Sequence, residues 1–267
     1  MKTAPPKQVE IAIIGGSGFE SLLECSHRIR VKTPYGYPPL ISIGEFETHR
    51  IAFLPRHGYK HEFLPHKINY RANIYGLYKI GVKRIFATNA VGAIDPKLQI
   101  GDIIVPHDLI DFTKQRPLTF FDESLDAHID FTEPYCNELR KALIQAAKKI
   151  GEPIHEHAVY ACMEGPRYET AAEIRMLRLL GCDIVGMTGI PEAVLARELG
   201  ICYASLCYVS NMAAGVGGRI SHQKITEVAS TIRPKLSNLL MQAILYLPRG
   251  CRYHRVLSKR HKEERKQ

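Results

Sequence analysis

The chain has 267 residues, of which 45% are hydrophobic and 24% charged, a composition that favours one globular α/β domain. No apolar run reaches the roughly 20 residues that cross a bilayer, and the first eight residues lack the apolar core of a secretory signal. We therefore expect a cytoplasmic protein without a membrane partner. Of the formal net charge of +9, residues 249–267 carry +6. Such a terminal run is typical of a solvated tail, so we do not expect nucleic acid as a partner.

Short apolar runs rich in β-branched residues predict buried strands, and segments with a helical apolar period predict helices between them. The strands are expected at residues 9–14, 50–54, 83–88, 102–105, 157–162, 183–187 and 201–209. The helices are expected at residues 68–80, 137–150, 168–180, 191–199 and 223–246. Glycine follows the first four helices directly, as is common after a helix end.

This alternation of strand and helix predicts an α/β fold with a mixed, largely buried β-sheet flanked by helices. We expect a single domain at residues 8–248, followed by a flexible basic tail at 249–267. Residues 107–133 are interpreted as one long, polar loop.

The seven cysteines form no C-x-x-C pair, and no His/Cys cluster has the spacing of metal ligands, so no metal site is expected. Cys202 and Cys207 lie in the expected strand 201–209, where burial as small apolar side chains is the favoured interpretation. A disulfide involving Cys136, Cys202, Cys207 or Cys251 stays open, although a cytosolic location argues against it.

The most informative segment is 9–19, where an apolar strand runs into a glycine turn that carries one hydroxyl, Ser17. Gly15, Gly16 and Gly18 allow backbone N–H groups to converge on one point, and Ser17 adds a hydroxyl donor. These features predict an anion-binding loop. Taken alone, an ordinary strand followed by a tight turn explains the segment equally well.

Two further strand ends carry groups suited to phosphate. After the strand 50–54, Arg56 and His57 place a guanidinium beside an imidazole, and Arg forms paired hydrogen bonds with phosphate. After the strand 83–88, the segment 88–92 offers backbone amides and an Asn side chain, although a plain turn explains it equally well. Because ligands of open α/β sheets bind at the carboxyl ends of the strands, we expect these segments to meet there.

Three later segments add partners for a purine. They are residues 164–170, 186–192 and 208–213. Taken singly, Glu169 is interpreted as a helix-capping carboxylate, Met187 as a core residue and Asn211 as a turn residue. Their occurrence together with the anion-binding segments indicates a site for a nucleoside and a phosphate.

These motifs resemble the trimeric purine nucleoside phosphorylase and methylthioadenosine phosphorylase family. The resemblance covers about residues 9–246 and rests, in order, on IIGGSG (13–18), PRHG (55–58), KINYRANIYGL (67–77), TNAVG (88–92), QIGDIIVP (99–106), EGPRYET (164–170), GMTGIPEAVLARELGICYAS (186–205) and SN (210–211). It implies that inorganic phosphate, a co-substrate, attacks C1′ of a purine nucleoside and releases the base and ribose 1-phosphate in purine salvage. It implies no metal or organic cofactor. A homotrimer is expected, and a hexamer stays open.

The resemblance also implies roles for individual residues. For phosphate binding they are Ser17, Arg56, His57, Asn89, Ala90 and Thr188. For contacts with the nucleoside they are Tyr168, Glu169, Met187, Asn211, Met212, Ala213, His128 and His222. Asn211 and His57 are the expected catalytic residues. Tyr168 is expected to stack on the base, Met187 to pack beneath the ribose, and His128 to reach the pocket of a neighbouring subunit.

Two positions predict which purine is used. Family members that act on 6-oxopurines resemble this chain in having Asn at the position of Asn211, whereas members that act on 6-aminopurines have Asp. The Asn NH₂ group can donate to O6, and its carbonyl can accept from N7–H as the base leaves. Glu169 can accept from N1–H, which hypoxanthine and guanine have and adenine lacks. We therefore expect inosine and guanosine as substrates.

The 5′ end of the sugar leaves alternatives open. Residues 187–193 and 211–215 resemble the S-methyl-5′-thioinosine phosphorylase branch, whereas His222 aligns with a histidine that meets the 5′-hydroxyl in the inosine and guanosine enzymes. A surface residue at a helix start is an equally good interpretation of His222. The competing hypotheses are an S-methyl-5′-thioadenosine phosphorylase, a nucleoside hydrolase, and a non-catalytic nucleotide-binding module. The sequence has neither a P-loop lysine nor a G-x-G-x-x-G motif, which argues against the nucleotide-binding module.

Overall fold

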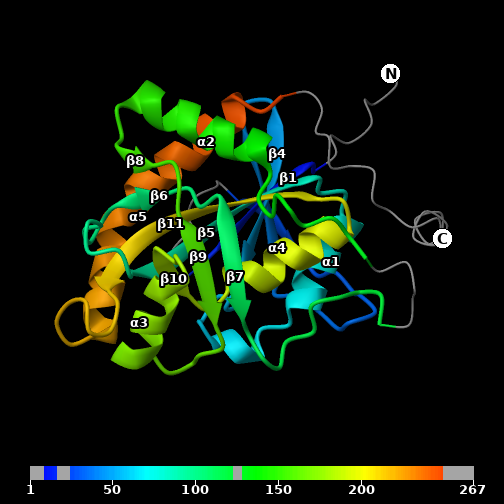
Figure 1. Cartoon of the computed structure of the whole chain (residues 1–267). Coiled ribbons are helices and arrows are strands. Elements are labelled where there is room, and N and C mark those ends of the chain that lie inside the picture. The colour runs from blue at the N-terminus through cyan, green and yellow to red at the C-terminus, as the bar shows by residue number, and fades with distance from the viewer. Residues whose placement is uncertain (1–8, 17–24, 123–127, 249–267) are drawn as a thin grey trace, which may run out of the picture.

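A mixed β-sheet of eleven strands lies at the centre of the described residues, which in this computed structural model are 9–16, 25–122 and 128–248 (Figure 1). The strands are β1 (Ile11–Gly15), β2 (Cys25–Ile29), β3 (Ile41–Phe46), β4 (His49–Pro55), β5 (Arg84–Ala93), β6 (Ile103–Ile104), β7 (Asp108–Phe112), β8 (Ile154–His155), β9 (Val159–Met163), β10 (Ile184–Gly186) and β11 (Cys202–Met212). The helices are α1 (Tyr70–Lys79), α2 (Asn137–Ile150), α3 (Ala171–Leu179), α4 (Gly189–Glu198) and α5 (His222–Leu245). The expected tail at 249–267 lies outside the described residues.

Strand β5 organises the sheet because it pairs with three other strands. The neighbours follow the order β2-β3-β4-β1-β5-β10-β9-β7, and β11 leaves this path to pair with β5 in parallel along almost its whole length. Strand β1 is parallel to both β4 and β5. The carboxyl ends of β1, β4, β5 and β11 therefore lie at the same edge of the sheet, where parallel sheets bind their ligands.

Both faces of the sheet are buried under helices, as the apolar runs predict. Side chains alternate along β1, so Ile11 and Ile13 pack in the layer of α2 and α5, whereas Ala12 and Ile14 pack in the layer of α1 and α4 (Figure 1). The described residues thus form the α/β fold expected from the sequence, a mixed and largely buried sheet flanked by helices.

All five predicted helices are present, with ends that differ from the predicted ones by three residues at most. Helix α2 has the predicted bounds and ends at Gly151, whose φ of 70° is the left-handed conformation that glycine adopts without strain. Helix α3 begins after Thr170 in a capping box: Thr170 accepts from the Glu173 amide, and Glu173 accepts in return from the amide of Thr170.

Two sequence interpretations of loops were wrong. Residues 107–133 are not one loop, because β7 lies within them and pairs with β9 at the edge of the sheet. Its half-exposed, partly polar sequence hides the strand from an apolar pattern. Residues 88–92 do not follow a strand but belong to β5, since β11 pairs with them residue by residue. Strands β2, β3 and β8 were also missed by the apolar pattern.

The cysteines differ in their chemical state. Cys202 is disulfide-bonded. The sequence had left open whether this cysteine forms a disulfide. Cys136, Cys162, Cys182 and Cys207 are free and buried. Cys202 and Cys207 both lie in the core, as expected. None of the helices in the described residues is long and apolar enough to cross a membrane.

Candidate active site

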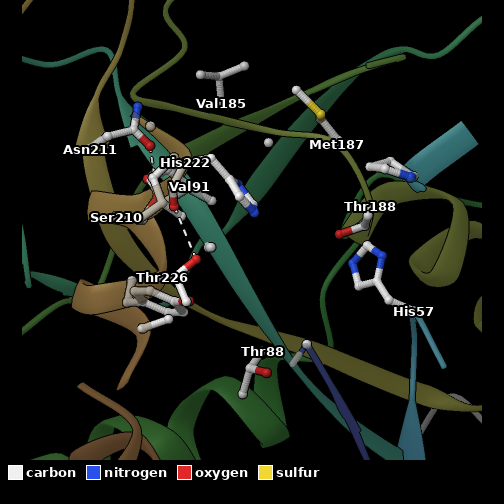
Figure 2. Close-up of a pocket in the computed structure, with 18 of the residues that line it drawn as sticks. His57, Thr88, Val91, Val185, Met187, Thr188, Ser210, Asn211, His222 and Thr226 are labelled. Atoms are coloured by element: carbon white, nitrogen blue, oxygen red, sulfur yellow. Dashed lines mark hydrogen bonds between the residues drawn. The ribbon is translucent and has the colours of Figure 1, made fainter. Parts of the chain in front are cut away.

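A cavity of about 590 Å³ lies at the carboxyl ends of the central strands (Figure 2). Residues that end or follow five strands line it, and residues 168–169, the first half of α5, His61 and Pro65 form the rest of its wall. Figure 2 places Asn211, Ser210 and His222 on one side of the cavity, and His57 and Thr188 on the other. The segments that the sequence singled out are thus brought together around one space.

Arg56 lies where β4 ends and is held rigidly by buried groups. Its Nε and Nη2 donate to Glu192 Oε1 and Oε2 at 2.5 and 2.9 Å, and its Nη1 donates to the Thr88 carbonyl at 2.9 Å. Tyr203 also donates to Glu192 Oε2, at 2.8 Å. Three of the five guanidinium donors are thereby used within the described residues, which leaves two donors on an arginine that lines the cavity.

The charge of Arg56 is secure although its side chain is only 2% exposed. Burial by itself would lower the pKa of Arg56, but the neighbouring Glu192 carboxylate, which is fully buried, more than offsets this and holds the pKa above its ordinary value. Glu192 and Tyr203 were not predicted as site residues. Glu192 lies in the predicted segment 186–192, but nothing in the sequence reveals its pairing with Arg56.

His57 is a neutral imidazole in this site. Its Nδ1 donates to the Phe63 carbonyl at 2.8 Å, and its ring stacks on His61 with centroids 4.3 Å apart. Burial, followed by the charge of Arg56, lowers the pKa of His57 to about 3. With Nδ1 as the donor, Nε2 carries a lone pair, so His57 offers the cavity an acceptor rather than a positive charge.

Thr188 is oriented by residues behind the cavity wall. Its Oγ1 donates to Asn89 Oδ1 at 3.1 Å, and Asn89 Nδ2 donates to Ser205 Oγ at 2.7 Å. Side chains alternate along β5, so Thr88 and Ala90 line the cavity while Asn89 faces the opposite side. This geometry favours a supporting role for Asn89. Ser205 was not predicted.

Asn211 reaches the cavity through an irregularity of β11. The register against β5 shifts between Val209 and Asn211, and such a bulge re-aims the following side chain. Ser210 Oγ donates to Asn211 Oδ1 at 2.9 Å (Figure 2). Asn211 Nδ2 donates to the Met212 carbonyl at 2.9 Å. The carboxamide keeps one N–H and one carbonyl lone pair, so it can both donate to a ligand and accept from it.

Glu169 is the one acidic residue among the described residues that line the cavity. Its Oε1 is buried without a hydrogen-bond partner, and burial raises the pKa of this carboxyl group. The neighbouring Tyr168 is 38% exposed, and its hydroxyl lies 3.4 Å from His222 Nδ1. A buried acceptor beside an aromatic ring suits a planar base with an N–H group.

Comparison with known proteins shows the family of this chain. Residues 10–245 match the model of the Phosphorylase superfamily. The chain belongs to the phosphorylase superfamily. It is 48% identical to the 6-oxopurine nucleoside phosphorylase of Pyrococcus furiosus, over 91% of this chain and 96% of that protein. It is 50% identical to a probable S-methyl-5′-thioinosine phosphorylase of Methanopyrus kandleri, over 91% and 95%.

Solved phosphorylases share the fold. A methylthioadenosine phosphorylase from an antarctic soil metagenomic library superposes with a TM-score of 0.89 at 34% identity, over 95% of this chain and 92% of that chain. The resemblance that the sequence motifs indicated is therefore confirmed at the level of family and fold.

In this superfamily member, Arg116 holds two segments of the cavity wall together. Its guanidinium donates to the Met187 carbonyl, to the Glu164 carbonyl at 2.5 Å and to the Tyr70 hydroxyl at 3.1 Å. Met187 lines the cavity, and its sulfur packs so closely on Gly165 that a Cβ there would lie 2.6 Å from it. Arg116 lies in the region interpreted as a polar loop, so its role was missed.

Some predicted residues lie elsewhere. Ser17 is outside the described residues, although Gly16 before it lines the cavity. Met212 and Ala213 pack in apolar clusters rather than lining the cavity. His128 is exposed and does not line the cavity of its own chain. Among the residues with assigned positions, no group of three or more His, Cys, Asp or Glu could hold a metal ion.

Proposed function

We propose that this chain catalyses the phosphorolysis of 6-oxopurine nucleosides, above all inosine and guanosine, to the free base and ribose 1-phosphate. One observation carries the proposal: Asn211 and Glu169 line the same cavity, and a carboxylate oxygen of Glu169 has no hydrogen-bond partner. Hypoxanthine and guanine present an N–H at N1 and acceptors at O6 and N7, so both groups find partners on the same base.

The phosphate co-substrate is assigned to the opposite side of the cavity. Arg56 offers its two remaining donors to the phosphate, and Thr188 lies on the same side of the cavity as His57 (Figure 2). The neutral His57 accepts the hydrogen of a P–OH group through Nε2. Ser17 and the Ala90 backbone complete the proposed set. A phosphate held next to C1′ turns a reaction between two molecules into one within a single complex.

The reaction separates charge, and each end of the cavity stabilises one part of it. A phosphate oxygen forms a bond to C1′ while the C1′–N9 bond breaks and its electron pair leaves with the purine. The anionic phosphate stabilises the positive charge that develops on the sugar, and the Asn211 carboxamide stabilises the departing base. No step requires a metal or an organic cofactor.

Selection against adenosine follows from Glu169. Adenine carries a lone pair at N1, so the carboxylate would face a second acceptor and keep its buried oxygen unpaired. A site built around buried hydrogen bonds strongly rejects a ligand that leaves them unmade. An S-methyl-5′-thioadenosine phosphorylase is the alternative that this carboxylate disfavours.

A second candidate substrate is S-methyl-5′-thioinosine. Ile225 and Ala229 on α5 line the cavity and offer apolar surface of the kind that suits a methylthio group, whereas His222 at the start of the same helix offers a polar partner. Both substrates share the base, so they differ only in the contacts with α5.

We also propose a homotrimer in which His128 reaches the cavity of a neighbouring subunit. This assignment is compatible with an exposed His128 that does not line its own cavity. Substituting His128→Ala is expected to raise the KM for inosine without changing the trimer, as measured by light scattering and steady-state kinetics. A monomer with full activity would contradict the assignment.

The deciding experiment measures base release from inosine, guanosine, adenosine, S-methyl-5′-thioinosine and S-methyl-5′-thioadenosine, with and without phosphate. We expect rapid release from the 6-oxopurine nucleosides with phosphate and none without it. Release without phosphate would instead establish a hydrolase. Binding without release would establish a nucleotide-binding module, and a preference for S-methyl-5′-thioadenosine would overturn the assignment of the base.

A further inference from the structure

Arg233 is a cation in the cavity wall for which the proposed reaction gives no role. It lies on α5, lines the cavity, and its Nε is buried without a hydrogen-bond partner. No carboxylate of the described residues pairs with it. A guanidinium donor that is withdrawn from water and left unpaired costs free energy unless a ligand satisfies it.

Thr88 is a second unsatisfied donor on the same cavity. Its residue is only 2% exposed, and its Oγ1 has no hydrogen-bond partner. Its backbone carbonyl is already used, because it accepts from Arg56 Nη1. Figure 2 shows the Thr88 side chain on β5, set apart from both Asn211 and His57. Neither Asn211 nor His57 therefore forms a hydrogen bond with the Thr88 hydroxyl.

Tyr208 connects these two positions. In the register of the parallel strands, Tyr208 lies beside Ala90 and Leu206 beside Thr88, so the side chains of Tyr208 and Thr88 are neighbours on one face of the sheet. Tyr208 also packs in one apolar cluster with Ile232 of α5, the residue before Arg233, and it lines the cavity together with Arg233 and Thr88. Burial raises the pKa of Tyr208 to about 12, and the charge of Arg233 acts in the opposite direction. Arg233, Tyr208 and Thr88 thus surround the same part of the cavity.

We propose that Arg233 and Thr88 bind a phosphoryl anion in this part of the cavity. A guanidinium fork and a hydroxyl donor are the groups that such an anion prefers, and the only acidic lining residue of the described chain, Glu169, lies next to Tyr168 at the purine end. The chemistry fits two sources, a free phosphate ion bound in addition to the co-substrate and the 5′-phosphate of a purine nucleotide. The inference rests on the proposed function in so far as the same cavity holds the nucleoside.

The test is calorimetric titration of the whole chain with inorganic phosphate, inosine 5′-monophosphate and inosine. Arg233→Met removes the charge and keeps most of the length, and Thr88→Val removes the hydroxyl and keeps the shape. Lys224→Met is the matched control, because it removes one positive charge from an exposed position of α5 that does not line the cavity. These titrations need no turnover, so they remain informative if base release is never observed.

We expect Arg233→Met to weaken the binding of a phosphoryl ligand about tenfold or more, and Thr88→Val to weaken it several-fold, while inosine binding stays at the wild-type value. A loss confined to inorganic phosphate identifies the free ion as the ligand of Arg233 and Thr88, and a loss confined to inosine 5′-monophosphate identifies the 5′ ester. If Arg233→Met does not fold, as judged by circular dichroism, Thr88→Val decides. The proposal is overturned if the folded variants bind both phosphoryl ligands as tightly as Lys224→Met does.

Discussion

Glu192 accepts two parallel hydrogen bonds from Arg56, of 2.5 and 2.9 Å, although the two residues lie 136 positions apart in the chain. The carboxylate covers one edge of the guanidinium, so the remaining donors must point elsewhere. Because both side chains are buried, the pair cannot rearrange without exposing a charge to an apolar interior. The direction in which Arg56 presents its charge is therefore fixed by α4.

Substituting Glu192→Gln should impair phosphate binding more than nucleoside binding. The amide keeps the shape but removes the charge that orients Arg56, so we expect the KM for phosphate to rise about tenfold while the KM for inosine changes little. Loss of one partner of a buried pair should also lower the free energy of unfolding by about 3–5 kcal/mol. Steady-state kinetics and urea denaturation measure the two effects.

Tyr203→Phe is the control for this pair, because it removes one hydrogen bond to the Glu192 carboxylate and keeps the charge of that carboxylate. We expect a loss of about 1.5–3 kcal/mol in the free energy of unfolding and a smaller effect on the KM for phosphate. An equal rise in both KM values for Glu192→Gln would contradict a role in orienting Arg56.

Substituting Asn211→Asp should shift the choice of base. A carboxylate cannot donate to O6 of hypoxanthine, so we expect kcat/KM for inosine to fall about 100-fold while that for adenosine stays equal or rises. The ratio of the two kcat/KM values is the measurement. Ser210→Ala is the control, since it removes only the hydrogen bond that orients the carboxamide, and it should lower both values together.

His57 should make the stability of the protein depend on pH. Its pKa is about 3 in the folded chain and ordinarily 6.5, so between these values the unfolded chain binds the extra proton. The contribution of His57 to the free energy of unfolding is therefore complete above pH 6.5. It falls by about 1.4 kcal/mol per pH unit as the pH drops towards 3. Urea denaturation of wild type and His57→Gln at pH 5, 6 and 7 isolates its share.

The same denaturation experiment can also contradict a neutral His57. If the difference in unfolding free energy between wild type and His57→Gln is constant from pH 7 to pH 5, then His57 titrates alike in both states and is not the neutral acceptor inferred here. The kinetic counterpart is a pH profile of kcat/KM without an inflection from His57 between pH 5 and 9.

Substituting Arg116→Met should weaken nucleoside binding selectively. Arg116 holds the carbonyl groups of Met187 and Glu164, which belong to the part of the wall assigned to the nucleoside. We expect the KM for inosine to rise about tenfold with little change in the KM for phosphate. Arg175→Met is the matched control, because Arg175 is an exposed residue of α3 that does not line the cavity. Similar kinetics for the two variants would contradict the assignment.

Substituting His222→Leu should change the preference at the 5′ end. Leucine joins the apolar surface of Ile225 and Ala229 and removes the polar partner of a 5′-hydroxyl, so kcat/KM for S-methyl-5′-thioinosine should rise relative to inosine by about tenfold. Lys224→Met on the same helix is the control. An unchanged ratio would show that His222 does not contact the 5′ substituent.

Much of the fold was visible in the sequence because it depends on local signals. The apolar period of α2 and the glycine at 151 gave both ends of that helix. The apolar run at residues 9–14 predicted a buried strand, and its side chains do alternate between the two cores. Strand β7 was missed because its formation depends on pairing with β9, which no local pattern encodes.

The chain by itself determined which chemical groups are present: a glycine turn, a guanidinium beside an imidazole, and an amide and a carboxylate suited to a 6-oxopurine. Only the tertiary structure decided how they are oriented and charged. The strand ends had to meet before Glu192 could fix Arg56, before burial could make His57 neutral, and before the shifted register of β11 could aim Asn211 into the cavity. Hydrogen bonds and electrostatic fields act through space between residues distant in sequence, so local patterns of apolar and polar residues do not specify them.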